Sequence, residues 1–71
     1  MAVFIFVTNI NTKRDINRLK PYLDHNQDII NWTVDLTDEE KVLRVETDTL
    51  LRFEVTTLIR VCGYDCHKMD W

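Results

Sequence analysis

A hydrophobic run, a polar loop and a helix start meet in the stretch Thr8-Asn9-Ile10-Asn11-Thr12-Lys13-Arg14-Asp15. The run before it, Val3 to Thr8, is rich in β-branched and aromatic residues, which indicates a buried strand. Within the stretch, Asn11 or Thr12 offers a helix N-cap, and Thr12 and Asp15 have the spacing of a capping box. The junction therefore predicts a strand, a short loop and a helix in that order.

The helix that follows is amphipathic. Ile16, Leu19 and Leu23 recur at helical spacing and define its apolar face. Pro21 lies inside the same segment, where it removes one backbone hydrogen bond and is expected to bend the last turn. We therefore expect this helix to end near residues 24–26.

A β-hairpin is predicted next. Apolar and polar residues alternate from Trp32 to Leu36, which is typical of a half-buried strand. A polar turn, Thr37-Asp38-Glu39-Glu40, separates this strand from a second one, Lys41 to Glu46.

The segment Leu50 to Cys62 fits two structures. Its β-branched content favours a strand. Its length, and the apolar residues that share one helical face, favour a helix; these residues are Leu51, Val55, Leu58, Ile59 and Cys62. Asp48 or Thr49 can cap the start of a helix here, and Gly63 stands where a helix needs a left-handed residue after its end. Helix is our prediction.

With a short final strand in Tyr64 to Lys68, the element order is βαββα(β). This order predicts a single α+β domain over residues 1–71, a ferredoxin-like sandwich with two helices on one face of an antiparallel sheet.

Composition limits the classes of function. The chain has 71 residues, 45% hydrophobic and 30% charged, and its net charge of −3 provides no basic surface for nucleic acid or an anionic membrane. No apolar run reaches the roughly 18 residues that cross a bilayer. The start, Ala2 to Val7, lacks the basic flank and cleavage site of a signal peptide. We expect a cytoplasmic protein whose two cysteines are reduced thiols.

Several segments together resemble the heavy-metal-associated domains, the family of small copper chaperones and of the amino-terminal modules of metal-transporting ATPases. The matching segments are Thr8-Asn9-Ile10, Leu19-Lys20-Pro21-Tyr22-Leu23, Trp32-Thr33-Val34-Asp35-Leu36, Lys41-Val42-Leu43-Arg44-Val45 and Gly63-Tyr64. Their order and spacing cover nearly the whole chain, and the resemblance implies the same ferredoxin-like fold.

In that family the loop after the first strand carries a Cys-x-x-Cys pair that binds copper(I), zinc or a similar soft ion. The resemblance places Thr12 and Asp15 at the two cysteine positions. Soft ions need thiolate ligands, which a neutral hydroxyl and a hard carboxylate do not replace. Lys13 and Arg14, between the two positions, add positive charge where a cation would bind. We therefore expect no metal at this loop, and no cofactor.

The alternative is a heavy-metal (copper or zinc) binding or transport role through Cys62, Cys66 and His67. The spacing Cys-x-x-x-Cys-His is unusual for structural zinc, which normally takes four protein ligands. His25 would have to come from the end of another element to complete the set. Cys62 also lies on the apolar face of the second helix, where a thiol is usually a small core residue.

The outer face of the predicted sheet is a candidate contact surface. Side chains of a strand alternate between its faces, so if Phe4 and Phe6 face the helices, their neighbours face the other way. The resulting interaction set is Val3, Ile5, Val7 and Val42. An apolar patch left bare on so small a domain indicates a contact with a second copy or another protein. The alternative is that the carboxyl-terminal segment, with Met69 and Trp71, folds over it.

The sequence favours an interaction domain over an enzyme. The chain contains no serine, and neither cysteine has an evident base and orienting acid in the sequence. A small-ligand role like that of ACT-type regulatory domains would need a glycine-containing turn after the first strand, which residues 9–13 lack. RNA binding would need exposed aromatic and basic residues on the central strands, where aliphatic residues are expected.

Overall fold

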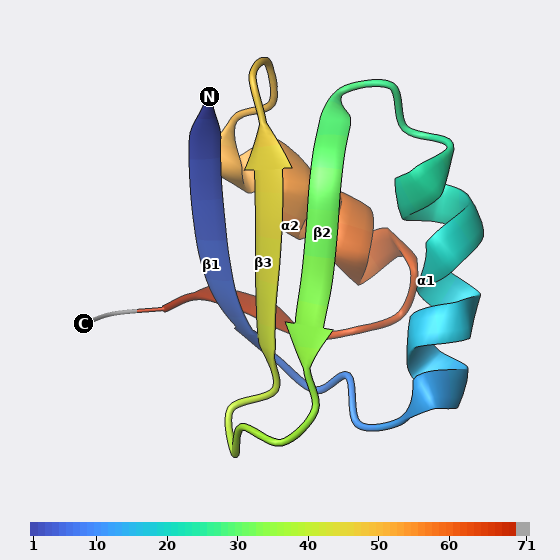
Figure 1. Cartoon of the computed structure of the whole chain (residues 1–71). Helices are drawn as coiled ribbons and strands as arrows, with labels where there is room; N and C mark the ends of the chain where they lie inside the picture. The colour runs from blue at the N-terminus through green and yellow to red at the C-terminus, as the bar shows by residue number, and fades with distance from the viewer. Residues whose placement is uncertain (70–71) are drawn as a thin grey trace.

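The fold is a βαββαβ chain in the computed structural model, which describes residues 1–69 (Figure 1). The elements are β1 (Ala2–Thr8), α1 (Lys13–Asp24), β2 (Ile29–Asp35), β3 (Val42–Thr47), α2 (Arg52–Val61) and β4 (Cys66–Lys68). Every predicted element is present, with ends shifted by a few residues: β2 begins earlier than the alternating pattern at Trp32 indicated, and β4 is confined to the end of its predicted segment.

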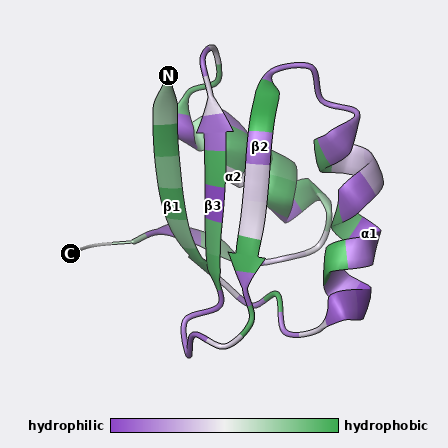
Figure 2. Ribbon diagram, viewed as in Figure 1, coloured by the Kyte–Doolittle hydropathy of each residue, from purple (hydrophilic) through white to green (hydrophobic). Residues whose placement is uncertain are grey.

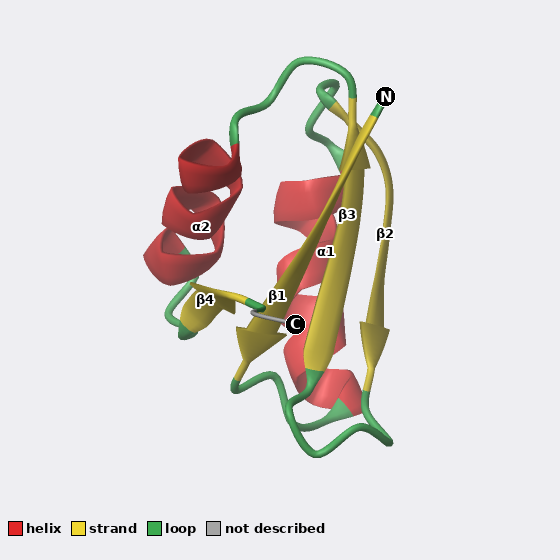
Figure 3. Cartoon of the chain, turned by 90° about the vertical axis from the view of Figure 1, so that its left-hand side faces the viewer, coloured by secondary structure: helices red, strands yellow, loops and turns green. Residues whose placement is uncertain are grey.

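The four strands form one sheet in the order β2-β3-β1-β4, and each neighbouring pair is antiparallel. Both helices cover the same face of this sheet, and the opposite face carries no helix (Figure 3). The predicted ferredoxin-like sandwich is therefore confirmed.

The core fills the space between the sheet and the two helices. Its fully buried side chains are Phe6, Ile10, Leu19, Leu23, Leu43, Val45, Val55, Ile59 and Cys66. They come from β1, the loop after it, α1, β3, α2 and β4, so every layer contributes. Hydrophobic residues are concentrated along β1 and α2, whereas α1 presents much hydrophilic surface to solvent (Figure 2).

Helix α1 starts as its sequence predicts. Thr12 is the N-cap, its hydroxyl accepts a hydrogen bond from the Asp15 N–H at 3.2 Å, and the Asp15 carboxylate accepts from the Thr12 N–H at 3.1 Å. The two bonds form a complete capping box. The helix continues through Pro21 and ends at Asp24, at the edge of the predicted range.

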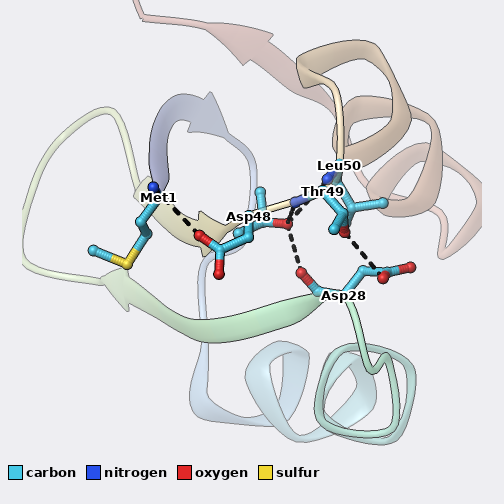
Figure 4. Close-up of polar contacts among 6 residues, drawn as sticks. Met1, Asp28, Asp48, Thr49 and Leu50 are labelled. Carbon is cyan, nitrogen blue, oxygen red and sulfur yellow. Dashed lines mark hydrogen bonds and ion pairs between the residues drawn. The ribbon is translucent and has the colours of Figure 1, made fainter.

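Helix α2 confirms the helical prediction for its segment, but the predicted caps at its start are wrong. Leu51 occupies the N-cap, and the Glu54 carboxylate accepts from the Leu51 N–H at 2.9 Å. Asp48 and Thr49 are engaged elsewhere: Asp48 pairs with the N-terminal ammonium group at 3.3 Å, and the Thr49 hydroxyl donates to Asp28 at 3.0 Å (Figure 4). The helix consequently begins later than expected.

Gly63, two residues after the last residue of α2, terminates the helix. Gly63 has a φ of 98°, in the left-handed region that suits glycine. Its N–H donates to the Arg60 carbonyl at 2.9 Å, and the Tyr64 N–H donates to the Ile59 carbonyl at 3.3 Å. These two bonds constitute a Schellman motif, so the predicted role of Gly63 is confirmed.

Two buried threonines organise the loops at opposite ends of the sheet. Thr47, fully buried at the end of β3, donates its hydroxyl proton to the Asp28 carbonyl and accepts from the Leu50 N–H at 3.1 Å. Thr8, at the end of β1, donates to the Lys41 carbonyl at 2.6 Å and accepts from the N–H two residues later at 3.2 Å. Each hydroxyl thus joins two chain segments that are distant in sequence.

Candidate functional site

The β1–α1 loop is the first candidate site, and Asp15 is its centre. One carboxylate oxygen, Oδ2, accepts from the backbone N–H groups of Asn11 and Thr12, both at 3.1 Å. The other, Oδ1, accepts from the Tyr64 hydroxyl at 2.8 Å. Both oxygens of the carboxylate are therefore occupied by donors from within the protein.

The surroundings of Asp15 favour its charged form. The hydrogen bond from Tyr64 and the N–H bond from Asn11 lower the pKa of the Asp15 carboxyl below its ordinary value of 3.8. Burial, and then the hydrogen bond to Asp15, raise the pKa of the Tyr64 phenol above 10.0. At neutral pH the pair is accordingly a carboxylate that accepts from a neutral phenol.

A second link joins the same two loops. The Asp65 N–H donates to Asn9 Oδ1 at 2.9 Å, and Asn9 Nδ2 donates to Asp65 Oδ2 at 3.4 Å. The segment from the end of β1 into the first turn of α1 is thus tied to the loop after α2 at two places, Asn9–Asp65 and Asp15–Tyr64. Sequence reasoning missed Tyr64 in this role. Its position directly after the helix-ending Gly63 was the available signal, but the two loops meet only in the folded chain.

Thr12 and Asp15 lie together at the start of α1, as the resemblance required of the two metal-ligand positions. Their polar atoms bond to each other and to neighbouring backbone groups. Lys13 and Arg14 are exposed in the first turn of the helix between them. The loop contains no thiol.

The second candidate group, Cys62, Cys66 and His67, is not brought together. Cys66 is buried opposite Thr8 on the helix-covered face of the sheet. His67 is its neighbour on the same strand, so its side chain points to the other face, opposite Val7, and it is exposed. Within residues 1–69, no group of three His, Cys, Asp or Glu side chains is placed to hold a metal ion.

The two thiols are also protonated at neutral pH. Burial raises the pKa of the Cys66 thiol to about 11, and burial likewise raises the pKa of the Cys62 thiol above its ordinary 9.0. Metal binding and nucleophilic attack both need the thiolate. Arg60 lies near Cys66 and donates to its carbonyl at 3.1 Å, but burial outweighs the effect of this cation on the thiol pKa.

The open face of the sheet is the third candidate. We call the side chains Val3, Ile5, Val7 and Val42 the valine row. Val7 and Val42 lie directly opposite each other across β1 and β3, and Ile5 lies opposite Arg44. Val3 is 39% exposed, and the other three members of the row are half-buried. The row is flanked by an ion pair between Arg44 and Glu46 at 3.0 Å.

The segment after β4 runs beside the valine row. The Met69 N–H donates to the Ile5 carbonyl at 3.1 Å, so the backbone continues along the edge of β1 to that residue. Trp71, which the sequence placed over this face as an alternative, lies outside the described residues.

One apolar surface was not foreseen. Phe53 and Val61, on the outer side of α2, are 66% and 77% exposed. They lie eight residues apart, on the helix face opposite Val55. This spacing of about two helical turns is visible in the sequence and could have indicated a second apolar surface. The predicted apolar face of this helix comprised Leu51, Val55, Leu58, Ile59 and Cys62, so it left out Phe53 and Val61 and did not indicate a second apolar surface. No helix of residues 1–69 is long and apolar enough to cross a membrane.

Comparisons with known proteins identify the architecture. No protein-family model and no curated protein matches the chain. Among solved structures, it is similar to the apo form of the HMA (heavy-metal-associated) domain of a copper chaperone for superoxide dismutase. The TM-score is 0.80 and the identity 19%, over 96% of this chain and 66% of that one.

The chain is also similar to the solved structure of the yeast copper transporter domain Ccc2a, determined in the apo and Cu(I)-loaded states. Its TM-score is 0.78 at 16% identity, over 96% of this chain and 94% of that one. At these identities the likeness concerns the fold. The chain therefore has the fold of the heavy-metal-associated domains of copper chaperones and transporters, as its sequence predicted.

Proposed function

We propose that this chain is a non-enzymatic interaction domain, built on the heavy-metal-associated fold, that carries no metal at its β1–α1 loop. The observation that supports this proposal is the state of Asp15. Its carboxylate occupies a position where the family has a thiolate, and both of its oxygens already accept hydrogen bonds. A soft cation would have to displace these donors and would gain only hard oxygen ligands.

The exposed Lys13 and Arg14 work in the same direction. They belong to the first turn of α1, where the helix dipole already adds positive potential. Two cationic side chains beside the loop raise the electrostatic cost of placing a metal ion there. The same surroundings suit the Asp15 carboxylate, which is an anion.

The contact itself is assigned to the valine row, which binds a second copy or another protein. The row lies on the face that no helix covers, and its members come from the two central strands. Central strands make a stiff platform, because both of their edges are hydrogen-bonded within the sheet. Burying such a row gives roughly 25 cal/mol for each Å² of apolar surface removed from water.

Sedimentation velocity and pull-down experiments on two variants test whether the valine row is the contact surface. Ile5→Lys places a charge in the valine row, whereas Val61→Lys makes an equivalent change on the exposed side of α2. We expect recovery of the partner, or the step of self-association that this face mediates, to be lost in Ile5→Lys and kept in Val61→Lys. A protein that recovers no partner and shows no such step, or an Ile5→Lys variant that associates as the wild type does, contradicts the assignment.

Metal binding elsewhere in the chain is tested separately. Native mass spectrometry after addition of copper(I) or zinc reports any stoichiometric ion directly. Metal that binds the wild type and disappears in a Cys66→Ser variant would support the Cys62, Cys66 and His67 alternative and contradict the proposal.

A further inference from the structure

Strand β2 offers a free edge. It pairs with β3 on one side, and on the other it has no strand partner in the described part of the chain. Natural proteins usually blunt such edges with lysine, proline or a bulge. Ile29–Asp35 contains no lysine, arginine or proline, and its one irregularity lies between Ile29 and Asn31. The remainder of the strand is a regular template for another strand.

The backbone groups that face this edge follow from the alternation of antiparallel pairs. The Ile5 carbonyl accepts a hydrogen bond from the chain that follows β4, so Ile5 directs its backbone groups away from β3. Its opposite residue, Arg44, therefore directs its groups to β2, where it meets Thr33. The residues on either side of Thr33 alternate again. Trp32 and Val34 accordingly direct their N–H and C=O groups to the free edge.

We propose that two copies of this chain associate by antiparallel pairing of β2 with β2, around a two-fold axis at Thr33. In this register Trp32 of one copy faces Val34 of the other, and the two exchange backbone hydrogen bonds. Asn31 faces Asp35 of the second copy, and Thr33 faces its own equivalent. Threonine with threonine is a favourable cross-strand pair, and the Asn31 side-chain amide can donate a hydrogen bond to the Asp35 carboxylate of the second copy. The strand is thus complementary to itself.

The surroundings of the edge leave it accessible. A groove of about 430 Å³ runs between α1 and β2, lined by Ile16, Lys20 and Asp24 on the helix side. Asp24 accepts a hydrogen bond from the Trp32 indole N–H at 2.8 Å, which holds the ring toward α1 and away from the free edge. Ile30 lines the same groove and is 54% exposed.

This edge is distinct from the valine row, so the inference does not depend on the proposed function. A two-fold axis perpendicular to the sheet joins two four-stranded sheets edge to edge and keeps the helices of both copies on one face. Both valine rows then lie together on the opposite face. Edge pairing and a contact through the valine row are compatible.

The test places charge on the axis. Thr33 is exposed, so Thr33→Lys and Thr33→Glu preserve the core and put like charges opposite each other in a dimer. Sedimentation velocity from micromolar to millimolar protein should show a dimer for the wild type and a monomer for each variant alone. An equal mixture of the two variants should recover a heterodimer, which native mass spectrometry identifies by its mass.

A second readout needs no variant. Amide hydrogen exchange of the wild type, compared at low and high protein concentration, should show protection that rises with concentration at Trp32 and Val34. The Thr33 amide, already bonded within the sheet, is the internal control.

Three results overturn the inference: a wild type that stays monomeric at millimolar concentration, a dimer that survives Thr33→Lys, or a variant mixture with no preference for the heterodimer. A dimer lost in Ile5→Lys but kept in Thr33→Lys would overturn edge pairing and support the valine-row contact instead. Loss in Thr33→Lys alone would leave the proposed function to be judged by its own partner test.

Discussion

A soft-metal site needs thiolate or imidazole ligands, and it needs them close together. The β1–α1 loop meets only the second requirement, and the segment with Cys62, Cys66 and His67 meets only the first. Thr12 and Asp15 lie together at a helix start, but they offer oxygen rather than sulfur. Cys62, Cys66 and His67 include the preferred ligand atoms, but the fold points Cys66 and His67 to opposite faces of the sheet. Ligand type and ligand placement are separate requirements, and here no single region meets both.

The largest expected effect is a difference in reactivity between the buried Cys66 thiol and the half-buried Cys62 thiol. A pKa of about 11 leaves the Cys66 thiol with about 100-fold less thiolate at neutral pH than a thiol at its ordinary 9.0. We expect iodoacetamide to label Cys62 first and Cys66 only on unfolding. Mass spectrometry of the alkylated peptides, with a urea-unfolded control, measures both rates. Rapid labelling of Cys66 in the folded protein would show that this thiol is not the core residue described here.

Replacing each thiol by a hydroxyl sharpens the same comparison in terms of stability. Cys66→Ser puts an alcohol among core side chains and should lower the free energy of unfolding by about 1–3 kcal/mol. Cys62→Ser is the matched change at a half-buried position, and its effect should be smaller. Urea unfolding followed by circular dichroism gives both values. Equal losses would contradict the burial assigned to Cys66.

The capping box predicts the next effect in size. Thr12→Ala removes the hydroxyl that accepts from the Asp15 N–H and should cost about 1 kcal/mol. Thr49→Ala, in the loop before α2, is the control, because Thr49 does not cap its helix and should cost less. The same unfolding assay decides, and a costlier Thr49→Ala would reverse the assignment of the caps.

The sequence predicted the loop at α1 better than the loop before α2, and the reason is physical. The Thr12–Asp15 box is a local interaction, so spacing along the chain reveals it. Thr49 has an equally good capping side chain, but Asp28, far away in the sequence, takes its hydroxyl proton. Local patterns fix a helix end only when no distant group competes for the same atoms.

For the candidate site too, the sequence predicted what depends on residue type and local spacing, and it did not predict contacts between residues that are distant in the chain. The replaced ligand positions follow from sequence, because they depend on residue type. The hydrogen bond between Tyr64 and Asp15 joins residues 49 positions apart, and the pairing of β4 with β1 decides that Cys66, and not His67, faces the core. The apolar pattern of helix α2 likewise predicted its buried face only in part. This pattern identified the buried face through Val55 and Ile59, but it also placed Leu51 on that face, and Leu51 is the N-cap of the helix and is 58% exposed.

The smallest expected effect is a pH dependence at the loop. The pKa of Asp15 is lower in the folded state, so its contribution to stability is present above 3.8 and is lost as the pH falls through its folded-state value. Tyr64→Phe removes the main cause of this shift. NMR titration of the Asp15 carboxyl carbon should therefore give a higher midpoint in Tyr64→Phe than in the wild type. Identical midpoints would mean that the Tyr64 hydroxyl does not stabilise the carboxylate.

The claim that the β1–α1 loop lacks a soft-metal site is tested most directly by copper(I) titration under reducing conditions, followed by native mass spectrometry. The wild type is compared with a Thr12→Cys/Asp15→Cys double variant, which restores thiolate ligands at the family's positions. We predict no stoichiometric copper on the wild type and one ion on the double variant. A wild type that retains copper, and loses it when Thr12 and Asp15 are changed to alanine, would contradict the claim.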